Sequence, residues 1–116
     1  MILFGIPNCD TVKKARVFLD QSNISYQFHD FRKDGLTVEM IQAWLSQVDY
    51  STLINKRSTT WKQLNDHERQ AIEQQDLTLL CQHPTLIKRP ILQYNKQVLI
   101  GFNQTEYQHL IQSNLS

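Results

Sequence analysis

The stretch MILFGIPNCDTVKKAR, Met1 to Arg16, changes from strand chemistry to helix chemistry within one short turn. Met1–Phe4 is an apolar run typical of a buried strand, and Gly5–Asn8 has the composition of a turn. Beyond the turn the apolar residues recur at the spacing of a helix, so we expect a helix from about Cys9 to Gln21. The stretch therefore predicts a strand, a turn and a helix, with a cysteine on the first turn of the helix.

The position of Cys9 favours a reactive thiol. Unpaired backbone N–H groups and the positive end of the helix dipole stabilise a thiolate at the start of a helix. Asn8 is a suitable N-cap for that helix. Asp10 opposes the effect, because a neighbouring carboxylate raises the pKa of a thiol, so a cation from elsewhere in the chain has to offset it. The alternative is that Cys9 is a small apolar residue of the core, which is the commoner fate of a free cysteine.

The composition is that of a small soluble protein. The chain has 116 residues, 41% of them hydrophobic, and 12 Lys and Arg against 11 Asp and Glu. We therefore expect a single domain over residues 1–116, with no direct contact to nucleic acid and none to a membrane. The apolar N-terminus is too short and lacks the charge of a signal peptide, so we expect a cytoplasmic protein, and we expect a monomer.

Cysteine and histidine are few and scattered. Cys9 and Cys81 have no C-x-x-C partner, so we expect two free thiols in a reducing compartment. Cys81 follows two leucines, which favours plain burial, and a role as a resolving thiol is the alternative. The histidines show no metal-ligand spacing, and we predict neither a metal nor a bound cofactor.

The remaining chain adds a strand, a helical segment, a hairpin and a last helix. Residues 24–31 alternate apolar and polar side chains, which completes a parallel β-α-β unit. Residues from about 37 to 83 show helical spacing in short pieces. The short apolar piece 86–87 precedes two strands, 91–94 and 97–100, joined by a two-residue turn. The expected N-caps of the later helices are Thr37, Thr60, Asp66, Asp76 and Asn103.

This order of elements is the plan of the thioredoxin fold. We predict an α/β protein with a mixed four-stranded sheet and a helical insertion between an N-terminal β-α-β unit and a C-terminal β-β-α unit. In that fold the reactive cysteine starts the first helix, and a proline before the hairpin faces it. Pro90 stands at that place, and such prolines are typically cis. An ordinary trans proline at the start of a strand is the alternative.

The motifs GIPNCDTVKKAR at 5–16, LIKRPIL at 86–92 and GFNQTEY at 101–107 resemble the arsenate reductase (ArsC)/Spx family. Within it they are similar to the YffB-type branch of small bacterial proteins. The resemblance covers essentially the whole chain, including the helical insert. It implies the thioredoxin-like fold and a nucleophilic cysteine close to the N-terminus.

The resemblance also assigns roles to three residues. In arsenate reductases the N-terminal cysteine attacks an oxyanion whose charge is held by three arginines. Cys9 matches the nucleophile, Arg89 matches the arginine before the cis proline, and Arg57 matches the arginine of the insert. A surface charge is the alternative for each arginine. The third arginine has no counterpart, since Leu99–Thr105 contains none, and two guanidinium groups leave one side of a tetrahedral oxyanion open.

Two functions fit these features. The first is an enzyme, a glutathione-dependent thiol reductase, in which Cys9 attacks a disulfide or a small oxyanion and glutathione, as co-substrate, resolves the intermediate. The second is a non-catalytic Spx-like regulator that binds RNA polymerase, although Val12 replaces the second cysteine of the C-x-x-C switch of Spx-type relatives. Lys56 and Lys88 adjoin the two arginines, but neighbours in extended segments point to opposite sides, so we give them less weight.

Overall fold

The computed structural model describes residues 1–115, with side chains described to residue 113. Contacts within the chain form two compact units. One consists of Met1–Asp30 with Arg89–Ser116 and is called the sheet unit here; the other, Phe31–Lys88, is called the helical unit. The helical unit covers more residues than the predicted insert of residues 37–83, because the connecting segments on both sides pack with it. The single domain over residues 1–116 stays a prediction.

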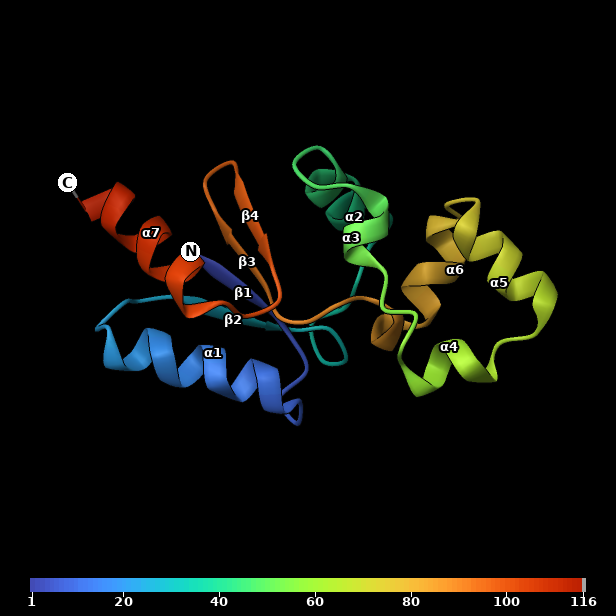
Figure 1. Cartoon of the computed structure of the whole chain (residues 1–116), viewed down its shortest axis with the longest axis horizontal. Helices are drawn as coiled ribbons and strands as arrows, with labels where there is room; N and C mark the ends of the chain where they lie inside the picture. The colour runs from blue at the N-terminus through green and yellow to red at the C-terminus, as the bar shows by residue number, and fades with distance from the viewer. Residues whose placement is uncertain (116) are drawn as a thin grey trace. The chain divides into compact units, whose positions relative to one another are not determined.

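The sheet unit contains a mixed four-stranded sheet in the order β2-β1-β3-β4 (Figure 1). Strand β1 (Ile2–Gly5) pairs in parallel with β2 (Gln27–Asp30) and antiparallel with β3 (Ile91–Tyr94). Strand β4 (Gln97–Ile100) pairs antiparallel with β3 and forms the opposite edge. The predicted α/β fold with a mixed four-stranded sheet is confirmed.

Two long helices complete the sheet unit. Helix α1 (Asp10–Gln21) follows β1, and helix α7 (Gln104–Leu115) follows β4. They share one core with β1 and β3, in which the ring of Phe18 lies 6.1 Å from that of Tyr107. The buried members of this core are Leu3, Ala15, Leu19, Leu92, Tyr107 and Leu110. Alternation on the strands and helical spacing on α1 and α7 bring these residues together.

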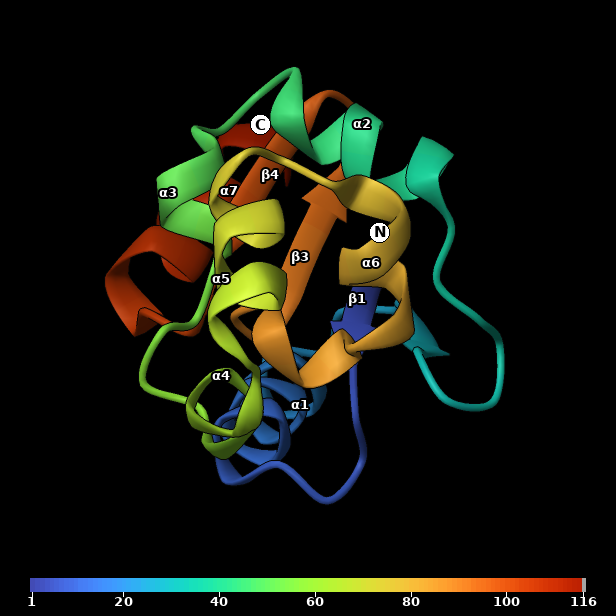
Figure 2. The same ribbon diagram turned by 90° about the vertical axis from the view of Figure 1, so that its right-hand side faces the viewer.

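The helical unit is built from short helices, shown in Figure 2. Helices α5 and α6 lie side by side, and α6 also packs with α2. The backbone pairing of Ile54 with Ile87 joins the segment after α3 to the segment before β3. In chain order the helices are α2 (Val38–Leu45), α3 (Tyr50–Leu53), α4 (Thr59–Gln63), α5 (Asp66–Glu73) and α6 (Leu77–Gln82), followed by one 3₁₀ turn, Pro84–Leu86.

Three of the predicted N-caps are confirmed. Thr37 accepts from the N–H of Met40, Asp76 accepts from the N–H of Leu79, and Asn103 accepts from the N–H of Glu106. Each is a short polar side chain whose oxygen reaches a donor left unpaired by the first turn of a helix.

The caps predicted at Thr60 and Asp66 are wrong. Ser58 caps α4, and Asn65 caps α5 in a capping box with Glu68. Both helices start earlier than predicted, so Thr60 and Asp66 lie inside the first turn. Neighbouring polar residues compete for a cap, and the one with extended backbone takes the role.

Strand β2 is shorter than the strand expected over residues 24–31 from the alternation of apolar and polar side chains. The chain turns sharply after α1, where Asn23 has φ 58° and the N–H of Ile24 donates to Leu19. Pairing with β1 therefore begins only at Gln27. The apolar piece 86–87 contributes to a 3₁₀ turn and an isolated bridge instead of a strand.

In the part of the chain that the structure describes, no helix has the length and apolar character needed to cross a bilayer.

Candidate active site

Cys9 follows a tight turn at the end of β1. The N–H of Cys9 donates to the carbonyl of Ile6 at 3.2 Å, which closes a four-residue turn with Pro7 and Asn8 at its corner. Proline suits the first corner position because its ring fixes φ near the value that the turn needs. The turn redirects the chain from the sheet into α1 and leaves Cys9 directly before the helix.

Cys9 is itself the N-cap of α1. Its backbone is extended (φ −93°, ψ 126°), its carbonyl accepts from the N–H of Lys13 at 3.0 Å, and the helix begins at Asp10. The prediction that Asn8 caps this helix is wrong, because the helix begins one residue later than expected and Asn8 lies exposed in the turn. A capping side chain faces the second and third helical N–H groups. For Cys9 these belong to Thr11 and Val12.

The surroundings of Cys9 lower the pKa of its thiol. Partial burial raises this pKa, but the N–H of Val12, the side chain of Arg89, the N–H of Thr11 and the charge of Arg89 together outweigh burial. The neutral thiol makes no capping hydrogen bond. It is the thiolate that these donors stabilise, since an anion attracts the unpaired N–H groups at the start of a helix.

Arg89 supplies the cation that the sequence required beside Cys9. Asp10, the residue expected to raise the thiol pKa, is exposed, so water screens its carboxylate. Arg89 immediately precedes β3 and is joined to Pro90 by a cis peptide bond. Pro90 is buried, and its carbonyl accepts from the N–H of Gly101 at 2.8 Å. The structure thus brings Cys9, Arg89 and the cis proline together within the sheet unit.

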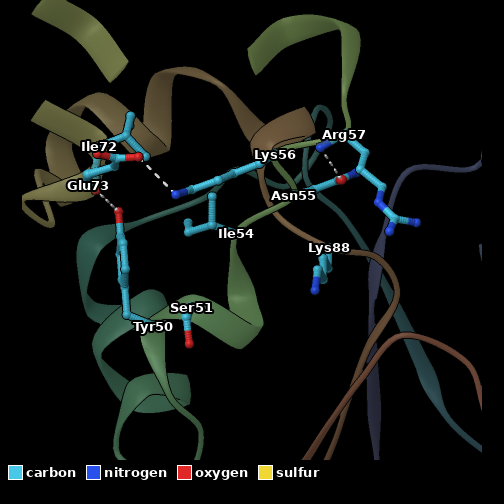
Figure 3. Close-up of a pocket in the computed structure, with 9 residues that line it drawn as sticks. All are labelled: Tyr50, Ser51, Ile54, Asn55, Lys56, Arg57, Ile72, Glu73 and Lys88. Carbon is cyan, nitrogen blue, oxygen red and sulfur yellow. Dashed lines mark hydrogen bonds and ion pairs between the residues drawn. The ribbon is translucent and has the colours of Figure 1, made fainter. Parts of the chain in front are cut away.

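Arg57 belongs to the helical unit, so its role toward Cys9 stays a prediction. It lies between α3 and α4, where its N–H donates to the side-chain oxygen of Asn55 at 3.1 Å. Its exposed side chain lines a pocket of about 850 Å³ within this unit (Figure 3). Lys56 and Lys88 line the same pocket.

Lys56 and Arg57 extend in opposite directions, Lys56 toward Glu73 and Arg57 away from it (Figure 3), but the backbone reason given for expecting this is wrong. It assumed an extended backbone, whereas residues 55–58 form a turn in which the N–H of Ser58 approaches the carbonyl of Asn55 at 3.4 Å. A turn does not alternate its side chains as a strand does, and both residues line the pocket although their side chains diverge.

Cys81 lies half-buried on α6 in the helical unit. Burial and the charge of Glu39 raise the pKa of its thiol. A protonated thiol is a poor nucleophile, which favours a packing role for Cys81 over a resolving one. Among the residues that the structure describes, no three His, Cys, Asp or Glu side chains lie close enough together to hold a metal ion.

One contact that helps to build the site was not predicted from the sequence. Gly5 ends β1 directly against Val12, and a Cβ on Gly5 would lie 2.8 Å from Cγ2 of that valine. Because Val12 supplies an N–H that stabilises the thiolate, this close approach helps to fix the first turn of α1 beside the sheet. The available signal was a glycine in the last position of an otherwise apolar strand.

Comparison with known proteins places these residues in a family context. The family model described as the ArsC family matches residues 4–110. An uncharacterized protein of Haemophilus influenzae is 44% identical over 107 residues, covering 91% of this chain and 94% of that protein. The global transcriptional regulator Spx of Staphylococcus aureus is 30% identical over 112 residues, covering 94% of this chain and 85% of the regulator.

The fold has a similar counterpart among solved structures. The structure of a YFFB protein superimposes with a TM-score of 0.87 at 33% sequence identity, covering 93% of this chain and 96% of that one. The resemblance inferred from the motifs around Cys9 and Pro90 is thereby confirmed at the level of family and fold.

Proposed function

Because the chain belongs to the ArsC family, we propose that it is a glutathione-dependent thiol reductase with Cys9 as its nucleophile. The observation that carries the proposal is the lowered pKa of Cys9 at the N-cap of α1, beside Arg89. The thiolate is the species that attacks disulfides, and a lowered pKa increases its share at a given pH.

The chemistry needs one protein thiol and an external one. The Cys9 thiolate attacks one sulfur of a disulfide substrate; the new S–S bond forms, the old one breaks, and the released half leaves as a thiolate that takes a proton from water. The thiolate of glutathione then attacks the substrate sulfur of this mixed disulfide and restores the Cys9 thiolate. The substrate sulfur leaves bound to glutathione.

Several features support an external resolving thiol. The position that would complete a C-x-x-C motif is Val12, which is fully buried. The thiol of Cys81 is held protonated by its raised pKa. Arg89, and Arg57 under the same proposal, would bind a carboxylate of glutathione or an oxyanion of the substrate through paired hydrogen bonds. The missing third arginine favours disulfides over arsenate as substrates.

The test is the pH dependence of alkylation and of turnover. Iodoacetamide reactivity of Cys81→Ser protein, in which Cys9 is the remaining thiol, should follow a pKa clearly below that of a free cysteine. Reduction of a small disulfide by glutathione should be lost in Cys9→Ser and kept in Cys81→Ser. Turnover that persists in Cys9→Ser, or an ordinary pKa for Cys9, would refute the mechanism.

A second candidate function is favoured by one comparison. The 30% identity to a transcriptional regulator covers nearly the whole chain and leaves open a regulator that binds RNA polymerase without catalysis. The two proposals differ in what Cys9 does. Specific capture of polymerase subunits by both the parent and Cys9→Ser proteins, together with no disulfide reduction by either, would favour the regulator.

A further inference from the structure

The pocket of the helical unit combines an apolar wall with two cations, Lys88 and Arg57, that pair with no acidic residue among the described ones. Ile54 and Ile72, both buried, form part of its wall, and the pocket volume is about 850 Å³. Pockets of this size and mixed character are typical of small-molecule sites. Figure 3 shows the side chains of Lys88 and Arg57 on the same side of this pocket.

The cations around this pocket differ in how they are held. Lys56 forms an ion pair with Glu73 at 2.9 Å, so its charge is already compensated. Among the described residues, no ion pair engages the ammonium of Lys88 or the guanidinium of Arg57. Two uncompensated cations thus line the pocket, and a ligand with two anionic groups would complement them.

Backbone hydrogen bonds hold together the two segments that carry these cations. The N–H of Lys88 donates to the carbonyl of Leu53 at 2.8 Å, and the N–H of Asn55 donates to Leu86 at 2.7 Å. These bonds flank the bridge between Ile54 and Ile87 and tie the segment carrying Lys88 to the segment that leads into Arg57. A prearranged site loses less conformational entropy on binding than a flexible one.

The hydroxyl group of Tyr50 stiffens the opposite wall. It donates to the carbonyl of Ile72, which joins α3 to α5. Burial and the charge of Asp76 raise the pKa of Tyr50 to about 12, so the phenol stays neutral and keeps this hydrogen bond at physiological pH. Tyr50 therefore adds no negative charge to the pocket, and the carboxylate of Glu73 on the same wall is paired with Lys56.

From this combination we infer that the pocket binds the two carboxylates of a small peptide thiol of the glutathione type, with Lys88 as the principal anchor. The ligand class follows from the pocket, which offers two cations and an apolar wall. Its identification with glutathione rests on the proposed function. Lys88 acts as a binding residue and takes no part in the chemistry at Cys9.

The experiment measures binding in the Cys9→Ser protein, so that no covalent step contributes. Calorimetric titration with reduced glutathione should give saturable binding, and glutathione diethyl ester, whose carboxylates are masked, should bind at least tenfold more weakly. Lys88→Gln should weaken glutathione binding at least fivefold. Lys33→Gln removes an exposed lysine of the same unit outside the pocket and should leave binding unchanged. Lys56→Gln should change it less than Lys88→Gln.

Other outcomes overturn the inference in distinguishable ways. Equal binding by Lys88→Gln and Lys33→Gln would remove Lys88 from the site. Equal binding of the diethyl ester, or competition by sulfate at the same concentration as glutathione, would contradict recognition of carboxylates. No binding by the Cys9→Ser protein, with a low Cys9 pKa retained in Cys81→Ser, would refute the pocket assignment and leave the proposed function standing.

Discussion

The substitution Gly5→Ala tests how closely β1 approaches α1. The added Cβ would lie 2.8 Å from Cγ2 and 3.3 Å from Cγ1 of Val12, whereas carbon atoms in contact prefer about 3.5–4.0 Å. Val12 is fully buried and has little room to move. Overpacking of this kind costs about 1–3 kcal/mol, and replacing a glycine returns about 0.4–1 kcal/mol through the unfolded chain. The difference spans about 0–2.6 kcal/mol, and because the buried Val12 cannot yield we expect a net loss of about 1–2 kcal/mol in the free energy of unfolding.

Urea denaturation followed by circular dichroism measures this loss. For a domain of this size about 1 kcal/mol corresponds to about 4 °C in Tm, so thermal melting provides a second reading. The pKa of Cys9 should rise in the variant, because a displaced Val12 N–H stabilises the thiolate less well.

The double variant Gly5→Ala/Val12→Ala is the matched control. Removing the valine methyl groups relieves the clash, so the double variant should be nearly as stable as Val12→Ala alone, and the two substitutions should be strongly non-additive. If Gly5→Ala is as stable as the parent protein, or if the two losses simply add, the close packing of Gly5 on Val12 does not hold.

Three further predictions concern the site and its supports. Arg89→Gln should raise the pKa of Cys9 and slow its alkylation by iodoacetamide severalfold near pH 6.5, with a normal rate at pH 10; an unchanged rate profile would count against Arg89. Because the pKa of Cys9 is lower in the folded chain than in the unfolded one, the parent protein should gain stability relative to Cys9→Ser as pH rises from the folded to the unfolded pKa, and lose that gain as pH falls. Denaturation at several pH values checks this, and a flat difference would contradict it. Asn65→Ala should cost about 1 kcal/mol in melting experiments because it breaks a capping box, whereas Asn8→Ala should cost almost nothing; equal losses would reverse the assignment of the caps.

Sequence patterns predicted the architecture wherever the spacing of apolar residues matched a single type of element, a strand or a helix. The apolar run of β1, the turn at Pro7 and the spacing of α1 all indicate the same structure, and the structure agrees. The patterns located helix starts less well, because Ser, Thr, Asn and Asp stand next to one another before α4 and α5. Each of them can cap a helix, and the backbone angles that select one depend on packing beyond the local sequence.

The site was predictable in part. The placement of Cys9 followed from its own neighbourhood, but Arg89 stands 80 positions later. No local pattern joins two such residues, so the pairing could be expected only from the family resemblance. The pocket around Lys88 depends on the turn after Asn55 and on a backbone bridge between distant segments. Both features depend on contacts between segments that are distant in the sequence, and the spacing of apolar residues does not predict them.

The position of Cys9 ties its redox state to the helix it precedes. As a thiolate, the Cys9 sulfur interacts favourably with the unpaired N–H groups of the first turn of α1. In a disulfide the same sulfur carries no charge, so this interaction is much weaker. Under the proposed function, formation and reduction of a mixed disulfide at Cys9 should therefore loosen and restore the first turn of α1. The rate of amide hydrogen exchange at Thr11 and Val12 would then distinguish the free Cys9 thiolate from its mixed disulfide.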